Sequence, residues 1–219
     1  MTAPADRAPL IALISATTAA IAPATAGLSR GFPEADVWNL VDDRLLAEAD
    51  AHGGLTPELS ARMTRLIDHA LAEGADGVLL TCSMYGPAAH AYPKADGPVL
   101  AADDGAFDAV LHGGFDRVLV AGSLESATRD ATRRLSAAAD SVSVPLEIDE
   151  VVARPATFVA TVAAADRTAR PDAILLAQYS LAPFADKLTA ATGGRPVLTG
   201  PDSAAAMLRA SIEAARSRP

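Results

Sequence analysis

The residue best suited to acid/base chemistry is Cys82, the only cysteine among the 219 residues. It follows the apolar run 78–81, which has the length of a buried strand, and it precedes Ser83 and Met84, where a helix is expected to begin. Free backbone amides and the helix dipole at such a position lower a thiol pKa from about 8.5 into the ~3.5–7.5 range. Cys82 is therefore a candidate base or proton donor near neutral pH. The alternative interpretation is an inert small hydrophobic residue.

Polar groups that suit anion binding follow this expected strand and two others. The hydroxyls of Thr17, Thr18 and Ser123, together with the amides of Ser83 and Met84, have the chemistry to bind a carboxylate and a developing oxyanion. Each hydroxyl taken alone suits an ordinary helix cap equally well. These residues are the first group of candidate substrate-binding residues.

A second group of polar side chains has less certain chemistry from sequence alone. Gln178 and Tyr179 are candidates for holding the far end of a substrate, or alternatively for hydrogen bonding between two lobes. The favoured interpretation of Tyr85 is a ring packed in the core with its hydroxyl in contact with solvent. Asp42 and Asp43 would either orient a substrate amine or, in the favoured interpretation, end a strand with solvated charge.

Other catalytic classes have little support in the sequence. There is no G-x-S-x-G elbow, no phosphate-binding loop and no G-x-G-x-x-G fingerprint after the first expected strand. The histidines, at positions 52, 69, 90 and 112, lack metal-ligand spacing, so no metal site is expected. A hydrolase that pairs Cys82 with His90 stays open as an alternative, although a position on a helix surface suits His90 better.

Composition and charge indicate which classes of molecule the protein can bind and where it is expected to work. The net charge of −9 and the pI near 4.8 disfavour nucleic acid and anionic membranes, whereas a small anionic substrate can still bind at backbone amides. A single cysteine excludes an intrachain disulfide. The apolar stretch 10–26 is interrupted by Thr17, Thr18 and Pro23, and Asp6 cancels Arg7 before it, so it is not interpreted as a signal peptide. Its first part, Leu10–Ser15, is interpreted as a buried strand. A cytoplasmic location is expected.

Short apolar runs alternate with helical patterns, which is typical of βα units and parallel sheets. One helix is well marked, with Thr56 as N-cap, Pro57 at its first position and Gly74 at its C-terminal end. The strands 37–41 and 144–148 are each expected to end in an acidic pair. The full set of expected strands is 10–15, 37–41, 78–81, 98–100, 118–121, 144–148, 174–176 and 196–198.

The chain contains an internal repeat, because segment 75–87 aligns without a gap to 171–183. The alignment pairs Cys82 with Gln178 and Ser83 with Tyr179, each at the carboxyl end of a strand, where open α/β sheets bind ligands. We therefore expect two similar α/β lobes with the active site between them. The first lobe is expected to span 1–100 plus a C-terminal helix at 201–219, and the second to span 101–200.

These segments resemble a known family. Segment 74–83 is similar to the first cysteine motif of aspartate, glutamate and hydantoin racemases and of maleate isomerase, and 173–180 is similar to their second cysteine motif, with Gln178 in place of cysteine. Segments 13–18 and 118–128 resemble the openings of the two lobes, and the resemblance places Gly122 and Ser123 in the cleft. It implies two Rossmann-like, four-stranded lobes related by a pseudo-two-fold axis, a homodimer, and chemistry without metal or pyridoxal phosphate.

The chain departs from this family at the second cysteine motif. The racemases use two thiols on opposite faces of a carbon, and Gln178 cannot exchange a proton at neutral pH. Arylmalonate decarboxylase, a relative, also keeps one cysteine, but in its second lobe. We therefore expect a cofactor-independent isomerase or racemase-like enzyme in which Cys82 transfers a proton at a carbon next to the carboxylate of a small acid. The alternatives are a decarboxylase or other lyase, and a non-catalytic binding protein on the same scaffold.

Overall fold

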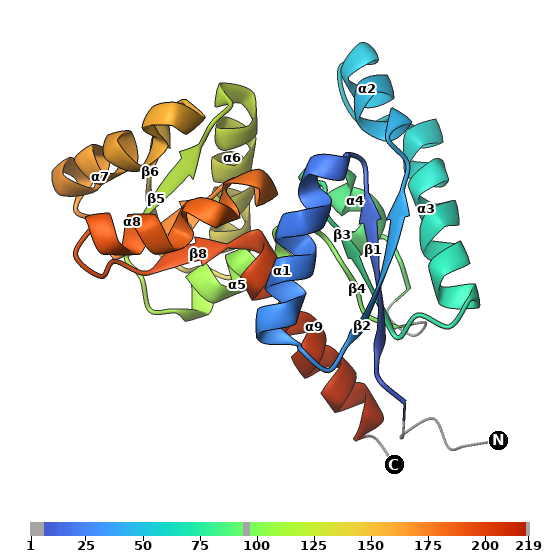
Figure 1. Ribbon diagram of the computed structural model, residues 1–219. Coiled ribbons are helices and arrows are strands. Elements are labelled where there is room, and N and C mark those ends of the chain that lie inside the picture. Colours follow the sequence, from blue (N-terminus) through green and yellow to red (C-terminus); the bar gives the residue numbers. More distant parts are fainter. Residues whose placement is uncertain (1–6, 94–96, 218–219) are drawn as a thin grey trace. The chain divides into compact units, whose positions relative to one another are not determined.

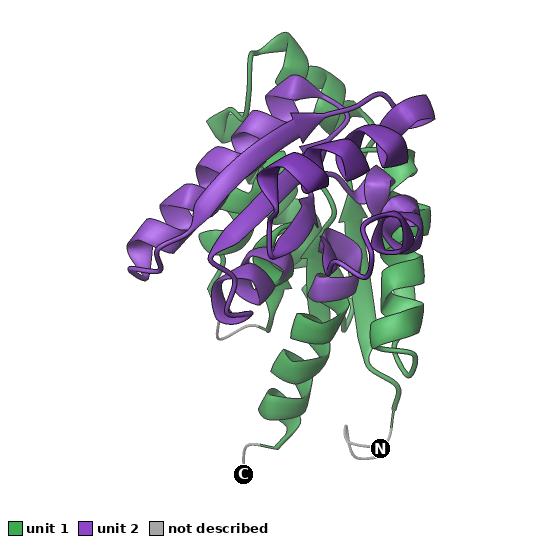
Figure 2. Cartoon of the chain, turned by 90° about the vertical axis from the view of Figure 1, so that its left-hand side faces the viewer, with its two compact units in different colours: residues 1–105, 204–219 green, residues 106–203 purple. Residues whose placement is uncertain are grey.

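The computed structural model describes residues 7–93 and 97–217, which form two compact units (Figures 1 and 2). Unit 1 contains the described residues up to Gly105 together with those from Ala204 onward, and unit 2 is Ala106–Ser203. Each unit has one four-stranded sheet in which all neighbouring strands are parallel. The predicted α/β fold of two similar lobes is confirmed.

The sheet of unit 1 has the order β2-β1-β3-β4. Its central strands are buried on both faces and are apolar except for Ser15 at the end of β1, as expected for a covered parallel sheet. The outer strand β2 is half-exposed. The strands are β1 (Leu10–Ser15), β2 (Asp36–Val41), β3 (Gly77–Leu80) and β4 (Val99–Leu100).

Helices cover both faces of this sheet. Met63 and Ile67 of α3 pack with Ile14 and Leu80 on one face, where α2 and α4 also contribute. Strands β2 and β3 lie on opposite sides of β1 in the sheet. Because βαβ connections are right-handed, the helix between β1 and β2, α1, covers the opposite face of the sheet. There, Leu208 of the C-terminal helix lies close to Gly77. The helices are α1 (Ile21–Gly31), α2 (Arg44–Ala51), α3 (Pro57–Ala72), α4 (Gly86–His90) and α9 (Gly200–Arg216).

Unit 2 repeats this plan with the sheet order β6-β5-β7-β8. One face packs against α5 and α6 through Val110 and Leu135, and the other packs against α7 and α8 through Phe158 and Leu188. The strands are β5 (Arg117–Gly122), β6 (Glu147–Val152), β7 (Ala173–Leu176) and β8 (Val197–Thr199). The helices are α5 (Asp104–His112), α6 (Glu125–Ser141), α7 (Phe158–Ala169) and α8 (Ala185–Ala191).

The internal repeat is visible in equivalent hydrogen bonds. In unit 1 a carboxylate oxygen of Asp76 accepts a 2.7 Å hydrogen bond from the amide of Leu10, the first residue of β1. In unit 2 a carboxylate oxygen of Asp172 accepts a 2.9 Å hydrogen bond from the amide of Arg117, the first residue of β5. The aspartates that the sequence alignment pairs therefore hold the same place in their two sheets.

Apart from the segment after Cys82, which is described below, the expected elements differ from the structure in two regions. The strand expected at 144–148 is displaced, because β6 is Glu147–Val152 and the acidic pair Asp149 and Glu150 lies inside it. An outer strand tolerates these charges, and Arg117 of the neighbouring strand forms ion pairs with Glu147 and Asp149. Helix α2 was not predicted from the sequence. Within the described part of the chain, no helix has the length and apolarity to cross a membrane.

Candidate functional site

Cys82 follows β3 and is half-buried at the carboxyl end of the central part of the sheet. Its extended backbone, with φ −121° and ψ 117°, ends the strand and begins the 3-10 turn Ser83–Tyr85. Thr17 and Thr18 follow the neighbouring strand β1 and lie at the same edge. We call Thr17, Thr18, Cys82, Ser83 and Met84 the cysteine edge, and unit 1 brings these predicted residues together.

The segment after Cys82 differs from the expected helix start. The α-helix begins only at Gly86 and has five residues. A helix beginning at Ser83 would need an N–H at position 87 to bond the carbonyl of Ser83, and Pro87 has none. The dipole near Cys82 is therefore that of a 3-10 turn and a five-residue helix, which is weaker than the dipole of a longer helix.

The threonines of the cysteine edge have different exposures. Thr17 is half-buried and caps the 3-10 turn Thr18–Ala20, with its hydroxyl accepting a 3.4 Å hydrogen bond from the amide of Ala19. Thr18 is exposed. Beneath them, the buried hydroxyl of Thr81 donates a 2.9 Å hydrogen bond to the hydroxyl of Ser15, which joins the ends of β3 and β1. Thr17 therefore acts as a helix cap, which was the alternative to a binding role. The exposed hydroxyl of Thr18 can contact solvent or a ligand.

Tyr85 fixes the turn that follows Cys82. Its ring is fully buried, and its hydroxyl donates a 2.8 Å hydrogen bond to the carbonyl of Leu45 in α2. The expectation of a solvated hydroxyl is wrong, because α2 supplies this acceptor. Burial, together with the nearby Cys82 thiol, raises the pKa of Tyr85 to about 12. Tyr85 therefore remains a neutral hydrogen-bond donor and is unsuited to proton transfer near neutral pH.

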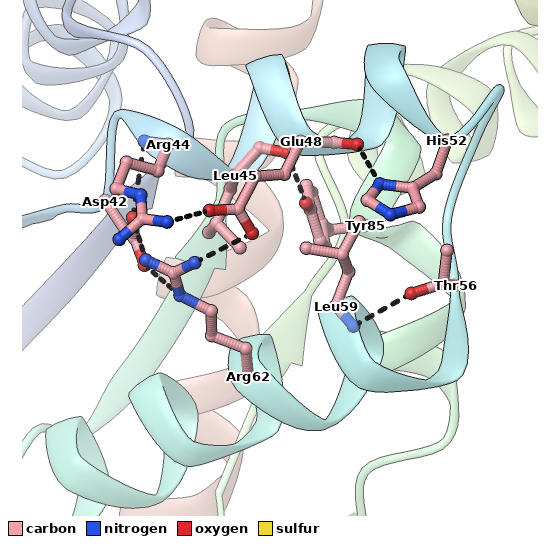
Figure 3. Close-up of polar contacts among 9 residues, drawn as sticks. All are labelled: Asp42, Arg44, Leu45, Glu48, His52, Thr56, Leu59, Arg62 and Tyr85. Atoms are coloured by element: carbon pink, nitrogen blue, oxygen red, sulfur yellow. Dashed lines mark hydrogen bonds and ion pairs between the residues drawn. The ribbon is translucent and has the colours of Figure 1, made fainter.

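A cluster of charged residues anchors the start of α2 beside this tyrosine (Figure 3). The guanidinium of Arg62, on α3, lies 2.6 Å from one oxygen of Asp42 and donates a 2.7 Å hydrogen bond to the other. The same group donates a 3.1 Å hydrogen bond to Glu48, whose other oxygen lies 2.7 Å from Arg44. We call Asp42, Arg44, Glu48 and Arg62 the α2 clamp.

The α2 clamp corrects the interpretation of the acidic pair. Asp42 is held by Arg62 with only 15% of its side chain exposed, so it neither ends the strand as a solvated charge nor stays available for a substrate amine. Asp43 is exposed and makes no side-chain cap bond at the start of α2. The four-residue spacing of Arg44 and Glu48 was a usable helix signal, whereas the pairing of Arg62 with Asp42 across 20 positions was not.

Unit 2 presents an equivalent edge. Ser123 follows β5, and Gln178 and Tyr179 follow the neighbouring strand β7. The Oε1 atom of Gln178 accepts a 2.8 Å hydrogen bond from the amide of Ser123 and a 2.9 Å hydrogen bond from its hydroxyl. We call Ser123, Gln178 and Tyr179 the glutamine edge. Tyr179 is buried.

Two small structural details support the glutamine edge. A Cβ at Gly122 would lie 1.9 Å from the hydroxyl oxygen of Thr128, so the end of β5 requires glycine to let α6 approach. Leu124, directly after Ser123, is 58% exposed. The edge therefore combines hydrogen-bonding groups with an apolar side chain that faces solvent.

Cys82 and Gln178 occupy equivalent positions in their own units. Each follows the third strand, has an extended backbone, and accepts at its carbonyl a hydrogen bond that opens the next turn, from Tyr85 at 3.1 Å and from Leu181 at 3.0 Å. The pairing predicted by the sequence repeat thus has a structural counterpart. The roles of these residues in binding or catalysis remain predictions.

The other candidate groups lie on the surface. His90 is exposed on α4, and its Nε2 atom lies 2.7 Å from Asp104, so the expected surface position is confirmed. Across residues 7–93 and 97–217, no three histidine, cysteine or acidic side chains are grouped as a metal site would need.

Comparison with known proteins gives matches in structure alone. No family model matches the chain, and no curated protein matches it in sequence. Allantoin racemase from Klebsiella pneumoniae has a similar structure, with a TM-score of 0.68 and 15% identity over 94% of this chain and 89% of the racemase.

Two further solved structures cover almost the whole of both chains. Aspartate racemase from Picrophilus torridus has a TM-score of 0.65 and 13% identity, and covers 94% of each chain. Unliganded arylmalonate decarboxylase has a TM-score of 0.62 and 17% identity over 93% of this chain and 92% of the decarboxylase. At these identities the comparisons show a common fold.

Proposed function

Since the chain has the fold of the aspartate/glutamate racemase superfamily, we propose that it is a cofactor-independent isomerase or lyase of that superfamily. Its substrate is a small carboxylic acid, and Cys82 exchanges a proton with the carbon next to the carboxylate. The observation that carries the proposal is the position of the only thiol, half-buried at the carboxyl end of a central strand in this fold.

The proposed isomerase step is a proton transfer in two stages. The Cys82 thiolate removes the proton from the substrate carbon, the electron pair of that C–H bond moves into the carboxylate, and an enediolate and a neutral thiol result. The thiol exchanges its proton with solvent, returns a proton to the carbon and becomes a thiolate again. Return on the same face exchanges the hydrogen and keeps the configuration, and the configuration inverts only when the enediolate presents its other face to Cys82. The hydroxyl of Thr18 and the amides of Ser83 and Met84 are proposed to bind the carboxylate and stabilise its added negative charge.

A lyase is the second candidate, and it is favoured by the equivalence of Cys82 and Gln178. Because one thiol faces the substrate, a proton is delivered from one side only. In a decarboxylation the bond to one carboxyl group breaks, carbon dioxide leaves, and the electron pair stays on the carbon as an enediolate. The Cys82 thiol protonates that carbon, and solvent water restores the thiol proton.

Proton exchange with solvent tests the proposal directly. The protein is incubated in deuterium oxide with D- and L-aspartate, D- and L-glutamate and phenylmalonate, and each acid is followed by proton NMR and for release of carbon dioxide. Deuterium at the carbon next to the carboxyl group without gas supports the isomerase, and gas release with one enantiomer of deuterated product supports the lyase. Binding of these acids without exchange or gas would favour a binding protein and contradict the proposed enzyme.

A further inference from the structure

A pocket of about 410 Å³ opens on unit 2, on the face of its sheet that α7 and α8 cover. Its wall consists of the 3-10 turn Pro155–Thr157, the first two turns of α7, and α8 with the residue before it. Every residue that lines the pocket belongs to unit 2. The volume falls in the range of roughly 300–1,000 Å³ that small-molecule sites occupy.

The wall of this pocket is largely apolar and contains one charged group. The rings of Phe158 and Phe184 meet there with their centroids 5.1 Å apart, and the small side chains of Ala160 and Ala163 leave space beside them. Lys187 is the only charged residue in the wall, and no residue that the structure describes forms an ion pair or a hydrogen bond with its ammonium group. In a chain with a net charge of −9, this wall complements an anion that has an apolar body.

The internal repeat shows how unit 1 covers the equivalent connection. Between β2 and α3 the chain of unit 1 forms α2, whose Leu45 and Ala49 are fully buried and whose Glu48 pairs with the guanidinium of Arg62. Between β6 and α7 the chain of unit 2 forms only the 3-10 turn Pro155–Thr157, in which no residue is buried. In unit 1, therefore, α2 supplies apolar side chains and a carboxylate, and the connection in unit 2 contains no counterpart of α2.

We propose that the pocket of unit 2 binds a small acid that combines an aromatic body with one carboxylate. The aromatic body lies against Phe158 and Phe184 and removes their apolar surface from water, and the carboxylate pairs with the ammonium group of Lys187. Such a ligand supplies the two kinds of group that α2 supplies in unit 1. This site goes beyond the proposed function and does not depend on it, because none of its residues belongs to the cysteine edge.

Two substitutions test the two parts of the pocket. Lys187→Met removes the ammonium group and keeps the length of the side chain. Ala160→Phe places a ring in the pocket from an exposed position on α7. Arg167→Met and Ala164→Phe are the matched controls, because they make the same kinds of change at exposed positions of α7 that do not line the pocket.

The probes are 4-phenylbutanoate and its neutral amide, with binding measured by calorimetry and folding checked by the urea midpoint of unfolding. We expect the wild-type protein to bind the acid more tightly than the amide. Lys187→Met should weaken binding of the acid by about 10-fold or more and leave binding of the amide unchanged, because only the acid pairs with the ammonium group. Ala160→Phe should weaken binding of both probes, and the two controls should resemble wild type.

Equal binding of the acid by wild type and Lys187→Met would overturn the proposal, and so would failure of the wild-type protein to bind the acid up to its solubility limit. Binding that is lost in Cys82→Ala but kept in Ala160→Phe would place the acid at the cysteine edge and would also overturn it. The proposed function is decided separately by the exchange and decarboxylation assays, whatever the result at this pocket.

Discussion

The hydroxyl of Tyr85 donates a 2.8 Å hydrogen bond to the carbonyl of Leu45, across 40 positions of the sequence. This bond joins the turn that follows Cys82 to helix α2. Tyr85→Phe keeps the buried ring and leaves the Leu45 carbonyl without its donor. We predict a loss of about 1–3 kcal/mol in the free energy of unfolding, because an unpaired buried carbonyl carries its full desolvation penalty. Urea denaturation measures this loss.

The same variant tests whether Tyr85 exchanges protons itself. With a pKa raised to about 12, its hydroxyl remains a neutral donor to Leu45, so the pH profile of turnover should keep its shape in Tyr85→Phe while the rate falls through a less ordered turn. A variant with wild-type stability, or one that loses a step from the pH profile, would contradict this account of Tyr85.

The α2 clamp depends on Arg62, which holds Asp42 and Glu48 with 27% of its own side chain exposed. Arg62→Met should lower the free energy of unfolding by about 1–3 kcal/mol, because it leaves partly buried carboxylates without their partner. Arg129→Met is the matched control, since the Arg129–Glu125 pair is 70% and 73% exposed. Such a pair contributes about 0–1 kcal/mol. Equal losses in the two variants would show that the clamp is an ordinary surface pair.

Asp172 gives the fold of unit 2 a predictable response to acid. The amides of Arg117 and Asp116 hold the pKa of its carboxyl group below the ordinary value. A carboxylate with a lowered pKa stabilises the folded state above its unfolded pKa, near 3.9, and loses this contribution as the pH falls through the folded pKa. Asp172→Asn should therefore be less stable than wild type at pH 7, with the difference shrinking below about pH 4.

Urea midpoints at pH 7, 5, 4 and 3 measure that difference. Asp140→Asn, on the exposed surface of α6, serves as the control and should follow the wild-type curve. A stability gap between Asp172→Asn and wild type that stays constant down to pH 3 would contradict the assignment to the carboxylate.

Much of the fold could be predicted from sequence because central parallel strands are buried on both faces. The runs 10–14 and Ala173–Leu176 are apolar without interruption, and this pattern alone locates them. Strand β6 was misplaced because it is half-exposed and carries charges that the neighbouring strand pairs. Helix α2 was missed because it is eight residues long and is held by tertiary contacts.

The candidate site also has a part that could be predicted from the sequence and a part that could not. The position of Cys82 after a buried strand and its pairing with Gln178 follow from apolar runs and from the repeat. The hydrogen bonds from Ser123 to Gln178 join residues 55 positions apart in the sequence, so no local sequence pattern could predict them. The expected homodimer and the substrate-binding roles of Thr17, Thr18 and Tyr179 remain predictions.

The most direct test of the central claim is the rate of solvent-deuterium exchange, or of decarboxylation, in Cys82→Ser. Serine keeps the size and hydrogen bonding of the thiol but has a pKa far above neutrality, so the rate should fall by at least ~10²–10⁴-fold. Cys82→Ala should lose activity equally, with a change of only about 1 kcal/mol in the free energy of unfolding. A Cys82→Ser protein with the wild-type exchange rate would show that this cysteine serves packing alone and would contradict the proposed function.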